Sequence, residues 1–166
     1  MDVKLFRAIN FLSGRSLMLD KMMIFISNRI RFVYILILII MFFKRQEYRK
    51  MAMDAAISIL ISLIINIFIK LFYFKPRPFL KRSVGILIPS KMDSSFPSKH
   101  TLLVFAVSTT IFFYHRFLGV IMGGMSFLTG LSRIWVGHHY PSDIIGSAFL
   151  GSLISLFVHK LSLFQK

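Results

Sequence analysis

Long uncharged stretches alternate with short basic segments along the chain. They are apolar on every side of a helix, whereas the helices of soluble proteins carry a polar stripe. Crossing a bilayer takes roughly 20 helical residues, so each stretch must include a charged residue at one end. The five stretches are Phe32–Phe43, Ala55–Ile69, His100–His115, Phe117–Ser132 and Ile144–His159. We therefore predict five membrane spans, near residues 22–43, 54–74, 98–115, 117–136 and 143–160.

The first 21 residues have a different pattern. Apolar residues such as Phe6 and Ile9 alternate there with Lys4, Arg7 and Arg15, which is typical of an amphipathic helix at the membrane interface. The segment has no clear small-residue cleavage site, so it does not resemble a cleaved signal peptide. Two arginines, at positions 29 and 31, fall inside the first span, so the span either begins after them or turns them toward a wet cavity.

Composition supports this membrane assignment. The chain has 166 residues, a net charge of +15, 56% hydrophobic residues and a mean hydropathy of +0.73. Nucleic-acid binders with so many cations are usually polar overall, and a soluble core of this size cannot bury so many apolar side chains. We predict one domain over residues 1–166, an all-α polytopic membrane bundle that binds no nucleic acid. The absence of cysteine excludes disulfide scaffolds and thiolate metal sites.

The connections between spans differ in length. The segment of about residues 75–97 contains four prolines and several cations, so it is predicted to be an irregular loop. The last two spans contain six glycines. They either let the helices pack closely or only reflect the glycine content that is usual in membrane helices.

Polar residues gather at one end of the predicted bundle. In an antiparallel arrangement, the end of the second span, the start of the third, the end of the fourth and the start of the fifth share one membrane face. These ends carry Lys70, Lys75, Arg77, Ser98, Lys99, His100, Arg133, His138, His139 and Asp143. Arginines grip phosphate oxygens with paired hydrogen bonds, and the free N–H groups of a helix start attract anions. The set favours a phosphate ester, although each cation alone could be snorkelling to the interface.

Histidines and one carboxylate supply candidate chemistry at this face. His139 and Asp143 are four residues apart, so a carboxylate could fix the tautomer of His139 and leave its other nitrogen free to attack phosphorus. His100 could then donate a proton to the leaving oxygen. The pair could instead be a helix cap or a structural hydrogen bond. A zinc site built from His100, His138, His139 and Asp143 is the rival use. Adjacent histidines diverge on a helix and the cations repel a metal, so we expect no metal and no other cofactor.

These residues match, in order, a three-part signature. The chain resembles the type 2 phosphatidic acid phosphatase superfamily in Lys70 through Arg77-Pro78, in Pro97-Ser98-Lys99-His100, and in Ser132-Arg133 with His139 and Asp143. The surrounding residues resemble the bacitracin-resistance type of undecaprenyl-diphosphate phosphatase. One departure is Lys99, where many members have glycine; the added charge could favour a diphosphate.

The resemblance implies a metal-independent mechanism in two steps. His139 is expected to attack the terminal phosphorus and form a phosphohistidine, while Asp143 holds His139 and His100 protonates the departing lipid phosphate. The phosphate oxygens are expected to be held by Lys70, Arg77, Ser98, Lys99 and Arg133. Water then cleaves the phosphohistidine.

The resemblance also implies a substrate and a location. A polyprenyl diphosphate, undecaprenyl diphosphate, is expected to be cleaved to the monophosphate, which recycles the lipid carrier of cell-wall synthesis and lessens sensitivity to bacitracin. The active face is expected to lie outside the cytoplasmic membrane of a bacterium. The positive-inside rule points the other way; we follow the resemblance because several cations have a ligand to explain them. Open alternatives are a phosphatase of another lipid phosphate, such as phosphatidylglycerol phosphate or phosphatidate, and a non-enzymatic anion or lipid transporter.

Overall fold

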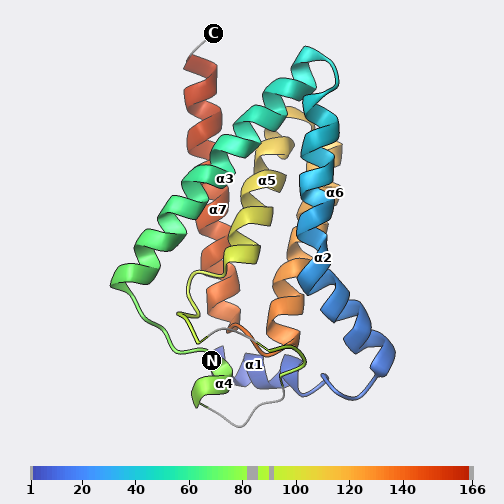
Figure 1. Ribbon diagram of the computed structural model, residues 1–166, viewed down its shortest axis with the longest axis vertical. Helices are drawn as coiled ribbons and strands as arrows, with labels where there is room; N and C mark the ends of the chain where they lie inside the picture. Colours follow the sequence, from blue (N-terminus) through green and yellow to red (C-terminus); the bar gives the residue numbers. More distant parts are fainter. Residues whose placement is uncertain (1, 82–85, 90–91, 165–166) are drawn as a thin grey trace.

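Helices make up most of the chain in a computed structural model, which describes residues 2–81, 86–89 and 92–164. They are α1 (Asp2–Asn10), α2 (Leu17–Phe42), α3 (Gln46–Phe72), α4 (Pro78–Lys81), α5 (Lys99–Tyr114), α6 (Arg116–Trp135) and α7 (Pro141–Phe164) (Figure 1). No strand occurs within these described ranges. The predicted all-α class is confirmed.

Five of these helices form the bundle. Four of them, α2, α3, α6 and α7, are long and apolar enough to cross a membrane. The fifth, α5, has 16 residues and therefore spans roughly 24 Å, a little less than a hydrocarbon core of about 30 Å. It packs against α3, α6 and α7 at the centre of the bundle (Figure 1). The chain is a multi-pass membrane protein, with its shortest span enclosed by the others.

Apolar side chains cover the outside of the bundle. Phe25 and Leu36 on α2, Ile64 and Phe68 on α3, and Phe157 on α7 are all more than half exposed. Contiguous apolar surface of this kind is rare on soluble monomers. It is the surface expected of helices that face lipid.

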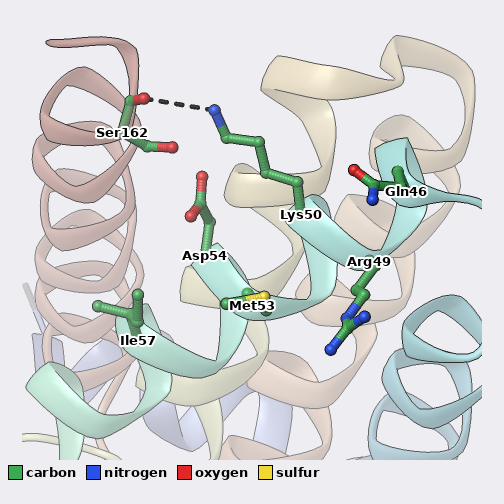
Figure 2. A pocket seen from close by; sticks show the side chains of 7 residues that line it. All are labelled: Gln46, Arg49, Lys50, Met53, Asp54, Ile57 and Ser162. Carbon is green, nitrogen blue, oxygen red and sulfur yellow. Dashed lines mark hydrogen bonds between the residues drawn. The ribbon is translucent and has the colours of Figure 1, made fainter. Parts of the chain in front are cut away.

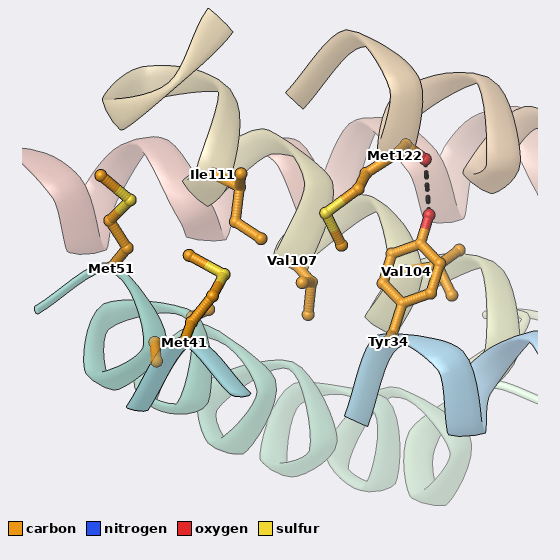
Figure 3. Packing of buried hydrophobic residues seen from close by; sticks show 9 residues of the cluster. Tyr34, Met41, Met51, Val104, Val107, Ile111 and Met122 are labelled. Carbon is orange, nitrogen blue, oxygen red and sulfur yellow. Dashed lines mark hydrogen bonds between the residues drawn. The ribbon is translucent and has the colours of Figure 1, made fainter. Parts of the chain in front are cut away.

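Methionine and branched aliphatic side chains fill the space between α2, α3, α5 and α6 (Figure 3). The hydroxyl of Tyr34 on α2 donates to the carbonyl of Met122 on α6 at 2.5 Å. Polar pairs also join α5 to α7, including Thr110 with Ser155 at 2.8 Å. Lipid tails are as apolar as the helices, so membrane helices associate through close packing and such polar contacts.

Two glycines let backbones approach closely. A Cβ added at Gly151 on α7 would lie 2.4 Å from the Leu102 carbonyl of α5, and one at Gly119 on α6 would lie 2.3 Å from the Phe112 Cα. At Gly123 and Gly124 nothing lies within 4 Å. Of the two interpretations of the glycines, close packing therefore applies at Gly151 and Gly119 and not at Gly123 and Gly124.

Three helices extend beyond the predicted membrane spans by four to eight residues. α2 begins at Leu17 instead of 22, α3 at Gln46 instead of 54, and α7 ends at Phe164 instead of 160. Charged residues were treated as limits of the apolar runs, but the end turns of a long helix can lie at the interface and carry them.

The N-terminal segment forms the predicted helix only over residues 2–10. The side chain of Phe6 in α1 is fully buried and packs on Tyr140, with ring centroids 5.5 Å apart. After α1 the chain turns at Gly14, whose φ of 83° is easy only for glycine. Helix α1 thus packs across the ends of α6 and α7.

The predicted irregular loop over residues 75–97 contains one short helix, α4, and otherwise no regular element in its described residues. This loop, α1 and α4 lie at one end of the bundle, and the C-terminus lies at the other (Figure 1). The end formed by α1, α4 and the loop is called the loop end below.

Candidate active site

A cavity of about 460 Å³ opens at the loop end. Its size is within the range of small-molecule sites. Its lining residues come from α2, α3, α5, α6 and the connecting loops: Asn28, Arg31, Asn66, Lys70, Arg77, Ile88, Pro89, Asp93, Lys99, His100, Arg133, His138 and His139. Six of the eight predicted site residues are in this list. The other two, Ser98 and Asp143, are fully buried.

A tight turn after α6 places the two adjacent histidines. Gly137 has a φ of 84°, its N–H donates to the Ile134 carbonyl at 3.0 Å, and the His138 N–H donates to the Arg133 carbonyl at 3.1 Å. This pair of hydrogen bonds is the Schellman pattern that ends many helices at glycine. It keeps Arg133 and His138 at the same cavity.

His139 is held through one ring nitrogen. Its side chain is 2% exposed, and Nδ1 lies 2.7 Å from the Ser95 carbonyl oxygen. A carbonyl only accepts hydrogen bonds, so Nδ1 carries the proton in this contact and Nε2 keeps its lone pair. His139 therefore has the tautomer in which Nε2 can act as a nucleophile.

The expected direct contact between Asp143 and His139 is absent from the hydrogen bonds of the described residues. The Asp143 carboxylate accepts from Lys75 Nζ at 2.6 Å, from Ser95 Oγ at 2.5 Å and from the Tyr140 N–H at 2.9 Å. The i,i+4 argument fails because His139 precedes α7, which begins at Pro141. Ser95 connects the two, since its Oγ also lies 3.5 Å from His139 Nδ1.

Three predicted phosphate-binding cations converge in the cavity. Lys70 Nζ lies 2.7 Å from one Asp93 oxygen, and Arg77 Nη2 lies 2.6 Å from the other. Arg133 is 6% exposed and donates from Nη1 to Ser27 Oγ at 2.6 Å. Its buried Nε has no hydrogen-bond partner within the described part of the chain. The three side chains supply many hydrogen-bond donors, and Asp93 pairs with two of them, Lys70 and Arg77.

The start of α5 brings His100 and Lys99 to the cavity but turns Ser98 away. His100 Nε2 lies 3.4 Å from Arg31 Nη1. The Ser98 N–H donates to Ser147 Oγ at 2.8 Å, and its hydroxyl accepts from Thr101 at 3.1 Å. Ser98 was expected to hold phosphate oxygens; the structure instead places it behind the cavity wall, with its backbone donor in use.

Burial and nearby cations keep the two loop histidines neutral. Burial, with the charges of Arg133 and Arg77, holds the pKa of His139 well below its usual value, against the opposing hydrogen bond to Ser95. Burial and the charge of Arg133 lower the pKa of His138 to about 4, although its hydrogen bond to the Ile88 carbonyl opposes this shift. At neutral pH the His139 ring therefore has a free lone pair.

Nearby cations keep the Asp93 side chain charged, whereas they help to keep the two histidines neutral. Burial raises its pKa, but the hydrogen bond from Lys70 and the charge of Arg77 outweigh burial, so the pKa of Asp93 lies below its usual value. The carboxylate is charged at neutral pH.

The rival zinc site requires its four candidate ligands to converge. Among the residues that the structure describes, no three His, Cys, Asp or Glu side chains are grouped to hold a metal ion. His138 donates from Nε2 to the Ile88 carbonyl at 2.8 Å, and Asp143 is occupied by Lys75 and Ser95.

A second cavity, of about 470 Å³, lies at the opposite end of the bundle. Figure 2 shows Lys50 donating to the Ser162 carbonyl across its mouth, at 3.3 Å. Asp54 also lines it and accepts a hydrogen bond from Tyr114. None of the three sequence motifs reaches this cavity, so it lies apart from the candidate active site.

Sequence reasoning missed four polar contributors to the loop-end cavity: Asn28, Arg31, Asn66 and Asp93. Arg31 had a signal, because an arginine inside an apolar span was predicted to be either outside the helix or at a wet cavity; the structure shows the second. Asp93 is one of only six acidic residues in a strongly basic chain. Its position in the cation-rich loop could have indicated that it pairs with the cations of the site.

Comparisons with known proteins identify the relatives of this chain. Residues 51–166 match the model of the PAP2 superfamily. Undecaprenyl-diphosphatase BcrC of Bacillus subtilis is 40% identical over 163 residues, covering 98% of this chain and 84% of that protein. An undecaprenyl-diphosphatase of Sulfolobus acidocaldarius is 32% identical, covering 93% and 75%.

A solved structure shares the arrangement of helices. LpxE of Aquifex aeolicus superimposes with a TM-score of 0.82 at 26% identity, covering 96% of this chain and 94% of that one. The family match covers more than half of the chain and includes all three motifs. The chain belongs to the PAP2 superfamily.

Proposed function

We propose that this protein is a membrane undecaprenyl-diphosphatase that releases the terminal phosphate of its lipid substrate. The observation that carries the proposal is His139, held at Nδ1 by the Ser95 carbonyl and lining a cavity that also contains Lys70, Arg77 and Arg133. The names of the similar Bacillus and Sulfolobus proteins support the substrate. Passive anion binding by a transporter would not require a histidine fixed in one tautomer.

The proposed reaction has two displacements. His139 Nε2 attacks the terminal phosphorus, the bond from phosphorus to the bridging oxygen breaks, and His100 gives a proton to the departing lipid phosphate. Water then attacks the phosphohistidine and gives a proton back to His100, which frees inorganic phosphate and His139. Lys70, Arg77, Lys99 and Arg133 stabilise the charge on the phosphate oxygens throughout.

Two residues change role relative to the expectation. Asp143 reaches His139 only through Ser95, so we assign it a positioning role. Ser98 organises the start of α5 through Ser147 and Thr101, so we assign it a structural role.

The direct test is phosphate release from purified protein with a panel of lipid phosphates in the presence of a chelator. Undecaprenyl diphosphate is expected to be hydrolysed faster than phosphatidylglycerol phosphate or phosphatidate. A strict requirement for added metal, or faster release from one of the other lipids, would contradict the proposal.

Asp93 is expected to compete with substrate for Lys70 and Arg77, because its two oxygens pair with both cations. Asp93→Asn should lower the inhibition constant for inorganic phosphate and the KM for substrate several-fold, with little gain in kcat. Asp2→Asn is the matched control, since Asp2 contacts Lys75 and Ser142 outside the cavity. Weaker phosphate inhibition in Asp93→Asn would show instead that Asp93 holds the cations in place.

We further propose that the loop end faces outward from the cytoplasmic membrane. The natural chain has no cysteine, so one introduced cysteine is a unique label. An impermeant thiol reagent on intact cells should modify Met92→Cys, at the loop end, and not Phe43→Cys, at the other end; both native side chains are about 80% exposed. Labelling of Phe43→Cys alone would reverse the orientation.

A further inference from the structure

A lipid diphosphate has two phosphate groups. In the reaction proposed above, Lys70, Arg77 and Arg133 hold the terminal phosphate beside His139, and Lys99 lines the same cavity. Taking the proposed function as its basis, we propose that Arg31 binds the inner, lipid-linked phosphate and gives the enzyme its preference for diphosphates over monophosphates. Arg31 lies outside residues 51–166, the part that matches the family.

Arg31 lies beside the proposed proton donor. Its Nη1 is 3.4 Å from His100 Nε2, and both residues line the cavity. His100 must reach the oxygen that stays with the inner phosphate when the bridging bond breaks. A cation next to His100 is therefore next to that phosphate, and it neutralises the charge that grows there as the bond breaks.

Arg31 has no acidic partner among the described residues, although it lies within an apolar span. It lies roughly 21 Å along the helix axis from Leu17, between Ile30 and Phe32 in a strongly apolar span. None of the ion pairs among the described residues includes it. The side chain of Arg31 is exposed, and its guanidinium lies 4.9 Å from the centroid of the Phe32 ring. A cation within an apolar span usually faces a functional cavity, and an anionic substrate group would neutralise it.

Arg31 also lies where the polar cavity meets an apolar groove. The groove, of about 140 Å³, is lined by Arg31 and by residues of α2, α3 and α5 that include Ile35, Leu38, Ile59 and Leu103. Figure 1 shows α2 and α3 diverging from their short connection toward the loop end. With the terminal phosphate at His139 and the tail against this groove, the inner phosphate lies at Arg31.

Arg31 and His100 contact each other, and we expect both to contact the inner phosphate instead when substrate binds. A guanidinium only donates hydrogen bonds, so His100 Nε2 accepts from Arg31 in this contact. The same nitrogen must carry a proton to protonate the leaving oxygen, and we expect it to take this proton from solvent when the anionic substrate binds beside it. An anionic phosphate between the two side chains lets both of them donate to it.

The test compares two substrates with the same prenyl tail, a diphosphate and a monophosphate. In Arg31→Ala, kcat/KM for the diphosphate should fall roughly ten- to a hundredfold, the range for a lost charged hydrogen bond, while that for the monophosphate changes little. Arg31→Lys should recover only part of the loss, because lysine lacks the planar fork. Arg29→Ala is the control, since Arg29 is exposed on the same helix and lines neither the cavity nor the groove.

Inhibition by inorganic anions gives a second readout. Arg31→Ala should weaken inhibition by diphosphate and leave inhibition by phosphate unchanged. Equal losses on both substrates, or no loss on the diphosphate, would overturn the assignment of Arg31. If Arg31→Ala fails to fold, Arg31→Gln takes its place, with the melting temperature as the check.

The two proposals fail in different ways. A wild-type protein that hydrolyses another lipid phosphate and not the prenyl diphosphate would refute the proposed function. The inhibitor comparison, followed with that other lipid, would still decide whether Arg31 forms a second phosphate subsite.

Discussion

Replacing His139 with alanine is expected to lower phosphate release by a factor on the order of 10⁴ or more, because the attacking nitrogen is removed. The neighbouring His138 is also held by a backbone carbonyl, that of Ile88, but through Nε2, so its nitrogen without a proton is the buried Nδ1. The wild-type His139 ring has its Nδ1 at the Ser95 carbonyl, at 2.7 Å, which leaves Nε2 for phosphorus. The measurement is kcat with undecaprenyl diphosphate, with the melting temperature as a check on folding.

His115→Ala is the matched control for His139→Ala. His115 caps α6 at the end opposite the cavity, where its Nδ1 accepts from the Leu118 N–H at 3.2 Å. Its loss should leave turnover near that of the wild type. Retention of more than a tenth of the activity in folded His139→Ala protein would show that the nucleophile lies elsewhere.

The second large effect is expected at Asp143. Its carboxylate is fully buried and accepts hydrogen bonds from Lys75, Ser95 and the Tyr140 N–H. Asparagine would turn an N–H₂ group toward one of these donors, so Ser95 and the ring that it supports should shift. We expect Asp143→Asn to lower kcat roughly a hundredfold with little change in KM, since the cations remain in place.

A double-mutant cycle with Ser95 tests the route of this effect. Ser95→Ala keeps the carbonyl that holds His139 and removes only the hydroxyl between His139 and Asp143. If Asp143 acts through that hydroxyl, the double variant should be about as slow as Asp143→Asn alone. Losses that multiply would mean that Asp143 acts by a separate path, such as its pairing with Lys75.

The helical bundle could be read from the apolar runs, but its limits could not. Arg29 and Arg31 interrupt the first run, and a sequence pattern does not say whether an arginine ends a helix or faces a cavity within it. The structure continues α2 through both residues and turns only Arg31 to the cavity. Likewise, the second span was predicted to begin near residue 54, after the charged first turns of α3, because the sequence does not show that these turns lie at the end of the bundle.

The residues of the candidate site were better predicted than their contacts. The ends of antiparallel spans must meet, so His100, Arg133 and His139 could be assigned to one face. Their partners depend on the path of an irregular loop. Ser95, which holds His139, and Asp93, which occupies Lys70 and Arg77, both lie in the segment 75–97, where no periodic pattern specifies which side chain faces which.

The central claim is that His139 takes the terminal phosphate onto its ring during turnover. Substrate carrying a radioactive terminal phosphate is mixed with enzyme, the reaction is stopped with alkali within milliseconds, and peptides are mapped. The account predicts a base-stable, acid-labile label on the peptide that contains His139, and no label in His139→Ala. Full turnover in the wild type with no trapped label at any quench time, or with the label on another residue, would contradict it.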